Sequence, residues 1–195
     1  MNRIASVERN TLETNIKIEL DIDGNGLLKG KTGIGFFDHM LNLLAKHGNF
    51  NLQIYTKGDT YIDNHHLIED IGIVLGECLL KALGNKAGIN RYGSFTCPMD
   101  ETLTTVDLDL SGRGYLVYNV KLSRDKVGEF ETEMLKEFLY ALAINGKFNL
   151  HINTHYGEND HHIIESIFKA MGRALRIACK IEEGNTDIPS TKGVI

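Results

Sequence analysis

A short motif occurs twice in this sequence, and the repeat limits the folds that the chain can adopt. His-His-x-x-Glu is found at His65–Glu69 and again at His161–Glu165. A second block agrees as well, because residues 44–53 align with residues 142–151. A matching order of strands and helices alone would be weak evidence. Two matched blocks that share a doubled histidine make internal duplication the better interpretation.

Apolar spacing predicts one order of elements in each half: strand, strand, helix, strand, helix. In the first half, about residues 12–83, alternating apolar positions predict a strand from Ile16 to Ile22, and helical spacing begins at Phe36 and at Leu67. The order returns at about residues 104–180, with strands near 106–110, 116–122 and 148–153 and helices near 131–145 and 161–180.

Two details of this pattern concern local contacts. The alternation over Leu116–Leu122 follows the turn Ser111–Gly114, which predicts a hairpin with the preceding strand. Asp63 and Asp160 stand just before the last helix of each half. An acceptor side chain at such a position caps free backbone N–H groups, so both aspartates are predicted to be helix caps.

The expected architecture is an α/β (α+β) sandwich in which each half places its helices on one face of a strand layer. A length of 195 residues suits one domain. We therefore expect a single domain of two pseudo-symmetric halves, about residues 1–95 and 96–183, followed by a C-terminal tail, residues 184–195.

Composition argues against several classes of protein. The chain has 21 lysines and arginines and 26 acidic residues, and its net charge of −5 does not suit a nucleic-acid partner. No apolar run approaches the length of a membrane span, and the N-terminus shows no apolar export signal. Cys78, Cys97 and Cys179 are far apart, which favours buried thiols in a reducing cytoplasm.

The doubled histidines carry the clearest chemistry. On a helix His65 and Glu69 share a face, whereas His66 lies about 100° round from His65. Adjacent histidines therefore reach two different ions rather than one. Imidazole and carboxylate together suit Mn, Fe or Zn, and with no cysteine nearby a thiolate zinc site is disfavoured. A polar helix start with solvated histidines is the alternative, which the duplication makes weaker.

One further ligand from each half would complete two sites of four. His39 opens a predicted helix, and Glu137 lies opposite it across the repeat. His151 competes with Glu137, although its repeat partner Gln53 is a poorer ligand. The predicted metal ligands are His39, His65, His66, Glu69, Glu137, His161, His162 and Glu165.

Cationic residues beside turns suggest that the chain binds an anion. Arg91 and Arg113 adjoin glycines, Lys169 lies one helical turn beyond Glu165, and the tail segment 189–193 offers hydroxyls and a lysine. Taken singly, each is better explained as a solvated charge. On the residues alone Glu13 is best explained as a surface charge. Asp100 and Glu101 remain open between polar turn residues and partners that orient ligand histidines.

Taken together, the motifs are those of a known family. They are Arg9-Asn-Thr-Leu-Glu-Thr14, Gly35-Phe-Phe-Asp-His-Met-Leu41, Asp63-Asn-His-His-Leu-Ile-Glu-Asp70, Arg91-Tyr-Gly93, Pro98-Met-Asp-Glu101, Ser111-Gly-Arg113, Asp160-His-His-Ile-Ile-Glu165, Phe168-Lys-Ala170 and Pro189-Ser-Thr-Lys-Gly193. They span residues 9 to 193, and the chain resembles the single-function imidazoleglycerol-phosphate dehydratases. The resemblance implies a duplicated fold like domain 2 of ribosomal protein S5.

The resemblance also implies an activity, a hydro-lyase step of histidine biosynthesis in the cytoplasm. D-erythro-imidazole-glycerol phosphate loses water to give imidazole-acetol phosphate, with two Mn²⁺ ions per site and 24 identical subunits that build the sites between them. No nucleic acid or membrane takes part. Carried over by motif, the catalytic residues are Glu13, His66 and Glu165, and the substrate contacts are Glu13, His39, His47, Arg91, Arg113, Lys169, Ser190 and Lys192. Many relatives have histidine where this chain has Glu137.

Two metals make chemical sense of this reaction. The hydrogen to be removed is bound to carbon and is barely acidic. A ring held as imidazolate between two ions can expel the C3 hydroxyl through a diazafulvene-like intermediate, with Glu13 as the base. Two other functions stay open on the residues alone: a two-metal phosphoester hydrolase, and a metal-storage or metal-sensing protein without catalysis.

Overall fold

The computed structural model describes residues 3–195, which form ten strands and four helices. The first half holds β1 (Ile4–Asn10), β2 (Thr14–Asp21), β3 (Leu27–Lys29), α1 (Gly35–Gly48), β4 (Asn51–Gly58) and α2 (His65–Leu83). The second half holds β5 (Tyr92–Met99), β6 (Thr102–Asp109), β7 (Tyr115–Asn119), β8 (Lys126–Val127), β9 (Phe130–Glu131), α3 (Met134–Gly146), β10 (Asn149–Tyr156) and α4 (Asp160–Cys179).

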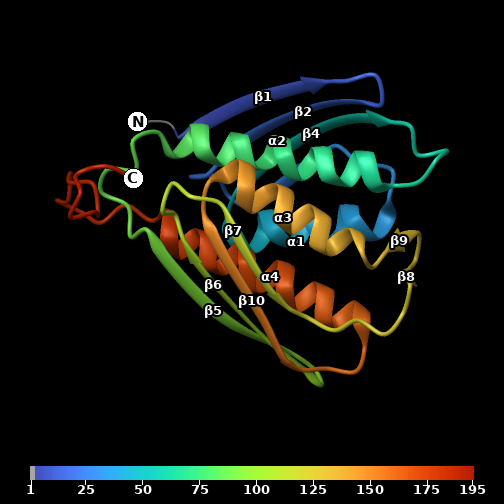
Figure 1. The fold of residues 1–195 in the computed structure, drawn as a ribbon. Coiled ribbons are helices and arrows are strands. Elements are labelled where there is room, and N and C mark those ends of the chain that lie inside the picture. The colour runs from blue at the N-terminus through green and yellow to red at the C-terminus, as the bar shows by residue number, and fades with distance from the viewer. Residues whose placement is uncertain (1–2) are drawn as a thin grey trace.

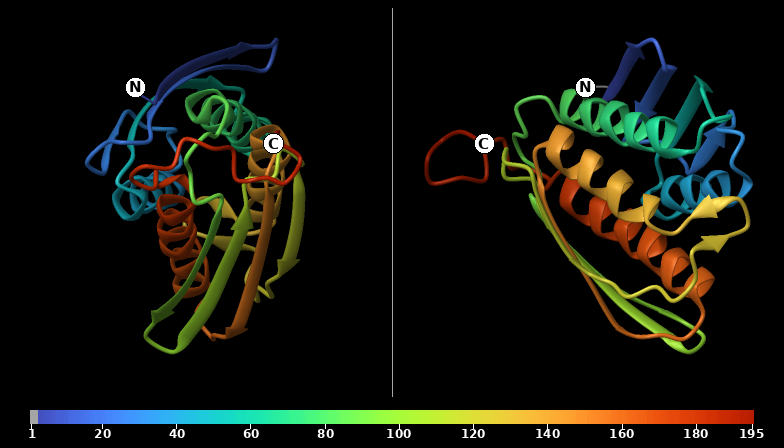
Figure 2. Two further views of the ribbon diagram at one scale, coloured as in Figure 1. Left: turned by 90° about the vertical axis from the view of Figure 1, so that its left-hand side faces the viewer. Right: turned by 45° about the vertical axis from the view of Figure 1, so that its right-hand side comes forward.

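Four helices lie between two four-stranded sheets (Figures 1 and 2). The strand orders are β1-β2-β4-β3 and β5-β6-β10-β7, the same arrangement in both halves. The first sheet packs on α1 and α2 and the second on α3 and α4, while α2 contacts α3 and α1 contacts α4. The predicted duplicated sandwich is therefore confirmed.

Strand order departs from the sequence prediction in two respects. Each four-stranded sheet has one strand more than the predicted repeat, because β1 and β5 precede the predicted pair, and the second half adds the short hairpin β8–β9. β1 buries only Ala5 and Val7, a short apolar signal. The predicted hairpin between residues 106–110 and 116–122 is wrong. β7 pairs with β10 in parallel, and the antiparallel neighbours of β6 are β5 and β10. Alternation shows that a segment is a strand but does not name its partner.

The two halves dock through glycines at equivalent positions. A Cβ on Gly76 would lie 2.7 Å from the backbone of Gly146 in α3, and one on Gly172 would lie 2.9 Å from the backbone of Gly48 in α1. Only glycine allows backbones to approach so closely. The contact of α2 with α3 is thus repeated by α4 with α1, and the halves form one unit around a continuous core.

The helix caps follow the repeat, with one correction. The Asp63 carboxylate accepts a hydrogen bond from the His65 N–H at 2.8 Å, as predicted. In the second half this acceptor is Asn159, which bonds the His161 N–H at 3.0 Å. Asp160 was wrongly predicted as the cap, because its carboxylate turns away from α4 and accepts from the backbone of residues 123 and 124.

Candidate metal centre

The predicted ligands lie on the first two turns of helices that begin at the same end of the molecule (Figure 1, right). α2 and α4 start with the doubled histidines, while α1 carries His39 and α3 carries Glu137. None of the helices among residues 3–195 is long and apolar enough to cross a membrane.

His39, His161 and Glu165 form a three-ligand cluster that joins the two halves. The Nε2 atoms of His39 and His161 lie 3.2 and 3.1 Å from Oε2 of Glu165, and the three ligand atoms are all within 4.8 Å of one another. Two imidazoles and a carboxylate converging on one point are a donor set for a divalent transition metal. The residues present therefore fit a metal ion.

Glu165 is the buried member of this cluster. Burial by itself raises the pKa of its carboxyl, but hydrogen bonds from Lys169 and His39 outweigh burial and hold that pKa below its usual range. The Lys169 ammonium lies 2.6 Å from the second oxygen of the carboxylate. Glu165 is thus kept ionised, which is the state that a metal ligand needs.

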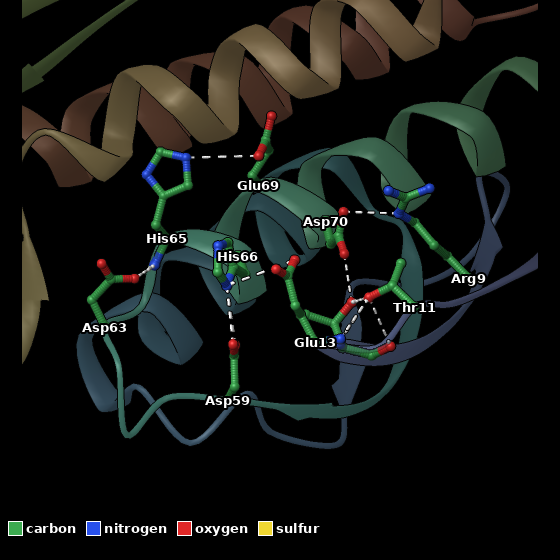
Figure 3. Close-up of polar contacts among 10 residues, drawn as sticks. Arg9, Thr11, Glu13, Asp59, Asp63, His65, His66, Glu69 and Asp70 are labelled. Carbon is green, nitrogen blue, oxygen red and sulfur yellow. Dashed lines mark hydrogen bonds and ion pairs between the residues drawn. The ribbon is translucent and has the colours of Figure 1, made fainter.

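The first motif arranges the equivalent pair more loosely. His65 Nε2 lies 3.7 Å from Glu69 Oε2 (Figure 3). Among residues 3–195, Glu137 joins no group of three ligand atoms. Its competitor His151 is exposed on β10 between the buried Leu150 and Ile152, and so it faces away from the helices. Glu137 as a ligand stays a prediction.

His66 points away from its neighbour, as the helical spacing predicts. Figure 3 shows His65 and His66 on different sides of α2, with His66 turned toward Asp59 and Glu13. Its Nδ1 lies 3.1 Å from Asp59 Oδ2 and 3.8 Å from Glu13 Oε2. The hydrogen bond to Asp59, helped by the charge of Glu13, raises the pKa of His66.

The second motif places a carboxylate in the same position. His162 Nδ1 lies 2.7 Å from Glu101 Oε2, and its Nε2 lies 3.8 Å from Asp100 Oδ2. Glu101 immediately precedes β6, as Glu13 immediately precedes β2. The hydrogen bond from His162, with backbone N–H groups of Glu158 and Asn159 before α4, holds the pKa of Glu101 far below its usual range. A carboxylate on one ring nitrogen orients the other toward a ligand.

The turn that carries Glu13 is anchored to α2. Asp70 is buried, and its carboxylate accepts from Arg9 Nε at 2.8 Å and from the Thr14 hydroxyl (Figure 3). Thr11 Oγ1 accepts from the backbone N–H of Glu13 at 3.1 Å. These bonds tie the turn to the residue that follows Glu69, so that the side chain of Glu13 is presented beside His66.

His47 and Lys169 lie along the seam between α1 and α4. His47 packs beside Gly172, close to Lys169 and Arg173. Burial, together with these two positive charges, lowers the pKa of His47. The imidazole is therefore kept neutral near the three-ligand cluster.

The other predicted anion contacts lie at the far end of the molecule. The Arg91 N–H bonds the Ala178 carbonyl at the last turn of α4, and its guanidinium holds Asp109 at 2.7 Å and the Pro189 carbonyl at 2.8 Å. Exposed Arg113 lies in the turn after β6, whose Gly112 packs against Ile195 of the tail. At 1.5 Å per residue, α4 separates Arg91 from His161 by about 25 Å. Ser190 and Lys192 lie in this tail.

Comparison with known proteins agrees with this architecture. The sequence profile of the imidazoleglycerol-phosphate dehydratase family matches residues 32–175. The dehydratase of Oceanobacillus iheyensis is 55% identical over 191 residues, covering 98% of each chain, and that of Pelobacter propionicus is 54% identical over the whole of both. The chain belongs to the imidazoleglycerol-phosphate dehydratase family. As a member it is a hydro-lyase of histidine biosynthesis.

Solved dehydratase structures share the fold. The imidazoleglycerol-phosphate dehydratase of Staphylococcus aureus superposes with a TM-score of 0.84 at 42% identity, covering 92% of this chain and 99% of that one. The Pyrococcus furiosus enzyme gives 0.83 at 37% identity, covering 97% and 100%. The fold of this dehydratase family member is therefore that of its relatives along nearly its whole length.

Sequence reasoning missed a carboxylate beside the doubled histidines of this dehydratase family member. Asp59, the closest partner of His66, follows β4 in the loop before α2. An acidic residue a few positions before a doubled histidine was the available signal, but a loop of that length does not fix where its side chain points.

Proposed function

We propose that the chain converts D-erythro-imidazole-glycerol phosphate to imidazole-acetol phosphate with two Mn²⁺ ions per site. The observation that carries the proposal is the convergence of His39, His161 and Glu165 from both halves of the chain. His65 and Glu69 offer the equivalent positions for the second ion, with Glu137 from α3, and His66 and His162 each offer a further nitrogen. Two such ions would stabilise negative charge on the imidazole ring of the substrate.

The chain itself supplies a base at the reacting carbon. Glu13 is the candidate because its carboxylate is 55% exposed, stands at the end of an anchored turn and faces His66. A carboxylate held in this way can accept the proton from a substrate carbon atom positioned against it. Lys169, by pairing with Glu165, keeps that ligand ionised and leaves its other oxygen for the cluster.

Each site is proposed to combine residues of different subunits. A ring and a phosphate joined by three carbons cannot bridge the roughly 25 Å between His161 and Arg91 in one chain. Arg91, Arg113, Ser190 and Lys192 of one copy would therefore bind the phosphate of a substrate held at the histidines of another.

The surface near Glu13 supports this assembly. Leu12 is fully exposed, and Tyr61 and Ile62 are 88% and 59% exposed. Leu12, Glu13 and Tyr61 line a groove of about 680 Å³ together with Tyr55 and Asp59. Large apolar side chains at such exposure mark interaction surfaces. We propose that other copies cover them in an assembly of 24 subunits.

The cytoplasm is the proposed location. Cys78, Cys97 and Cys179 are all buried and unpaired, and burial raises the pKa of the Cys78 thiol to about 12. Thiols of this kind suit a reducing compartment, where disulfides are rare.

The deciding experiment strips the protein with a chelator and titrates it with Mn²⁺ while following turnover of imidazole-glycerol phosphate. We expect turnover to return as about two equivalents per chain bind, in keeping with the two ligand sets. His161→Ala should bind less Mn²⁺ and lose turnover. The matched control is His155→Ala, on β10, whose ring bonds Thr105 on the neighbouring strand. Full turnover of the stripped protein would refute the metal dependence.

A further inference from the structure

The second half of the chain carries an insertion that breaks the internal symmetry. Thr14 and Thr102 begin equivalent strands, 88 positions apart, whereas Gly48 and Gly146 end equivalent helices 98 positions apart. Ten extra residues thus lie between β7 and α3, in the segment 120–133 that includes the hairpin β8–β9. The hairpin lies beside the end of the molecule where the helices begin (Figure 1).

The inserted segment holds the start of α2. Asn64 directly precedes His65, and its side-chain amide donates to the Glu129 carbonyl at 2.9 Å and to Glu131 Oε2 at 2.8 Å. The Asn64 carbonyl in turn accepts the first helical bond, from the Ile68 N–H at 3.0 Å. The hairpin of the second half therefore fixes the ligand helix of the first.

The same segment holds the start of α4. Asp160 directly precedes His161, is 1% exposed, and accepts backbone N–H bonds from Ser123 at 2.9 Å and Arg124 at 2.7 Å. Within the segment, the Thr132 hydroxyl donates to the Arg124 carbonyl at 2.6 Å and so joins its two ends. A buried carboxylate with two charge-assisted bonds is a firm attachment.

An aromatic cluster connects the hairpin with α1. Phe130, at the start of β9, is fully buried. Its ring stacks on that of Phe37, with centroids 5.7 Å apart, and packs against that of Phe36, with centroids 5.6 Å apart. Phe36 also packs edge-on against the imidazole of His161, with the ring centroids 5.0 Å apart. The ring of this ligand thus rests on a side chain that the hairpin holds in place.

We propose that residues 120–133 form a positioning element for the metal ligands, fixing the first turns of α1, α2 and α4 relative to one another. The inference rests on the proposed metal site. Histidines from different helices bind one ion only if their separations are held to a fraction of an ångström. The contacts through Asn64, Asp160 and Phe36 supply that constraint from a single segment.

The test measures Mn²⁺ affinity of the assembled protein against a competing chelator, together with the unfolding temperature of the metal-free protein. Asn64→Ala should weaken Mn²⁺ binding about tenfold, the effect typical of losing a partner outside the ligand shell. Asn145→Ala, which removes a similar amide bond at the far end of α3, is the matched control. It should leave the affinity unchanged with a similar shift in unfolding temperature.

Two further variants test whether Mn²⁺ affinity depends on the placement of the ligands rather than on the charge of Glu131 or on the stability of the protein. Glu131→Gln keeps an oxygen that accepts from Asn64 and should bind Mn²⁺ like the wild type. Phe36→Leu should weaken binding through the His161 ring. Wild-type affinity in both Asn64→Ala and Phe36→Leu, or a loss that merely follows the unfolding temperature, would overturn the inference and leave the metal site intact. A wild-type protein that binds no Mn²⁺ would overturn both.

Discussion

At the scale of single residues, Glu13 has both the position beside His66 and the exposed carboxylate that the proposed base needs. Its carboxylate lies 3.8 Å from His66 Nδ1 and is more exposed than any other acidic partner of His66 or His162 except Asp100. Glu13→Gln keeps the shape and removes the proton acceptor. We expect turnover to fall by about 10²–10⁴-fold while Mn²⁺ content stays at the wild-type level. Steady-state kinetics with metal analysis of the same sample measures both.

The control is Glu8→Gln, on β1 of the same hairpin, where an exposed carboxylate accepts from Asn10. It should leave turnover unchanged. If fully loaded Glu13→Gln turned over near the normal rate, Glu13 would not be the base.

The sequence predicted the divergence of His65 and His66 correctly, because helical geometry alone separates adjacent side chains by about 100°. It could not predict that Asp59 bonds His66 or that Arg91 bonds Asp109. Those pairs join loops and strands whose relative placement depends on the whole fold. Local periodicity carries no information about it.

At the scale of helices and strands, the docking of α4 on α1 depends on Gly172. A Cβ there would meet backbone atoms of Gly48 and Leu44 at 2.9 Å, and backbone cannot give way as a flexible side chain can. Gly172→Ala should therefore destabilise by about 1–3 kcal/mol, although alanine favours a helix by about 1 kcal/mol. We expect a lower apparent unfolding temperature by calorimetry.

Gly35→Ala is the matched substitution, since a Cβ at the first residue of α1 meets nothing within 4 Å. It should be neutral or slightly stabilising. An increase in unfolding temperature for Gly172→Ala as well would mean that α1 and α4 can separate at little cost.

Elements were predictable from sequence where their signal was local. Helices near 131–145 and 161–180 were found within a few residues of α3 and α4 because their apolar faces repeat over many turns. The pairing partner of β7 was not predictable. β7 pairs in parallel with β10, which follows α3 in the chain, and the sequence of β7 itself does not indicate that partner. The insertion at residues 120–133 contributes little periodicity, and its role depends on contacts with three helices.

At the scale of the whole molecule, the separation of ligands from cations predicts complementation between subunits. His161→Ala removes a proposed ligand at the start of α4, and Arg113→Ala removes an exposed cation in the turn after β6. Each variant assembly should be inactive for lack of one half of every composite site. In a mixed assembly, a site regains both halves when the cation comes from a His161→Ala chain and the ligand from an Arg113→Ala chain.

Refolding the two variants together at equal amounts should restore activity to about a quarter of the sites, as random pairing of subunits across one interface requires. Mixing the intact assemblies without unfolding is the control and should restore none before subunits exchange. A refolded mixture that stays inactive, although native mass measurement shows mixed assemblies, would mean that each site draws both groups from the same chain. The roughly 25 Å along α4 would then have to close by rearrangement, because no side chain spans it.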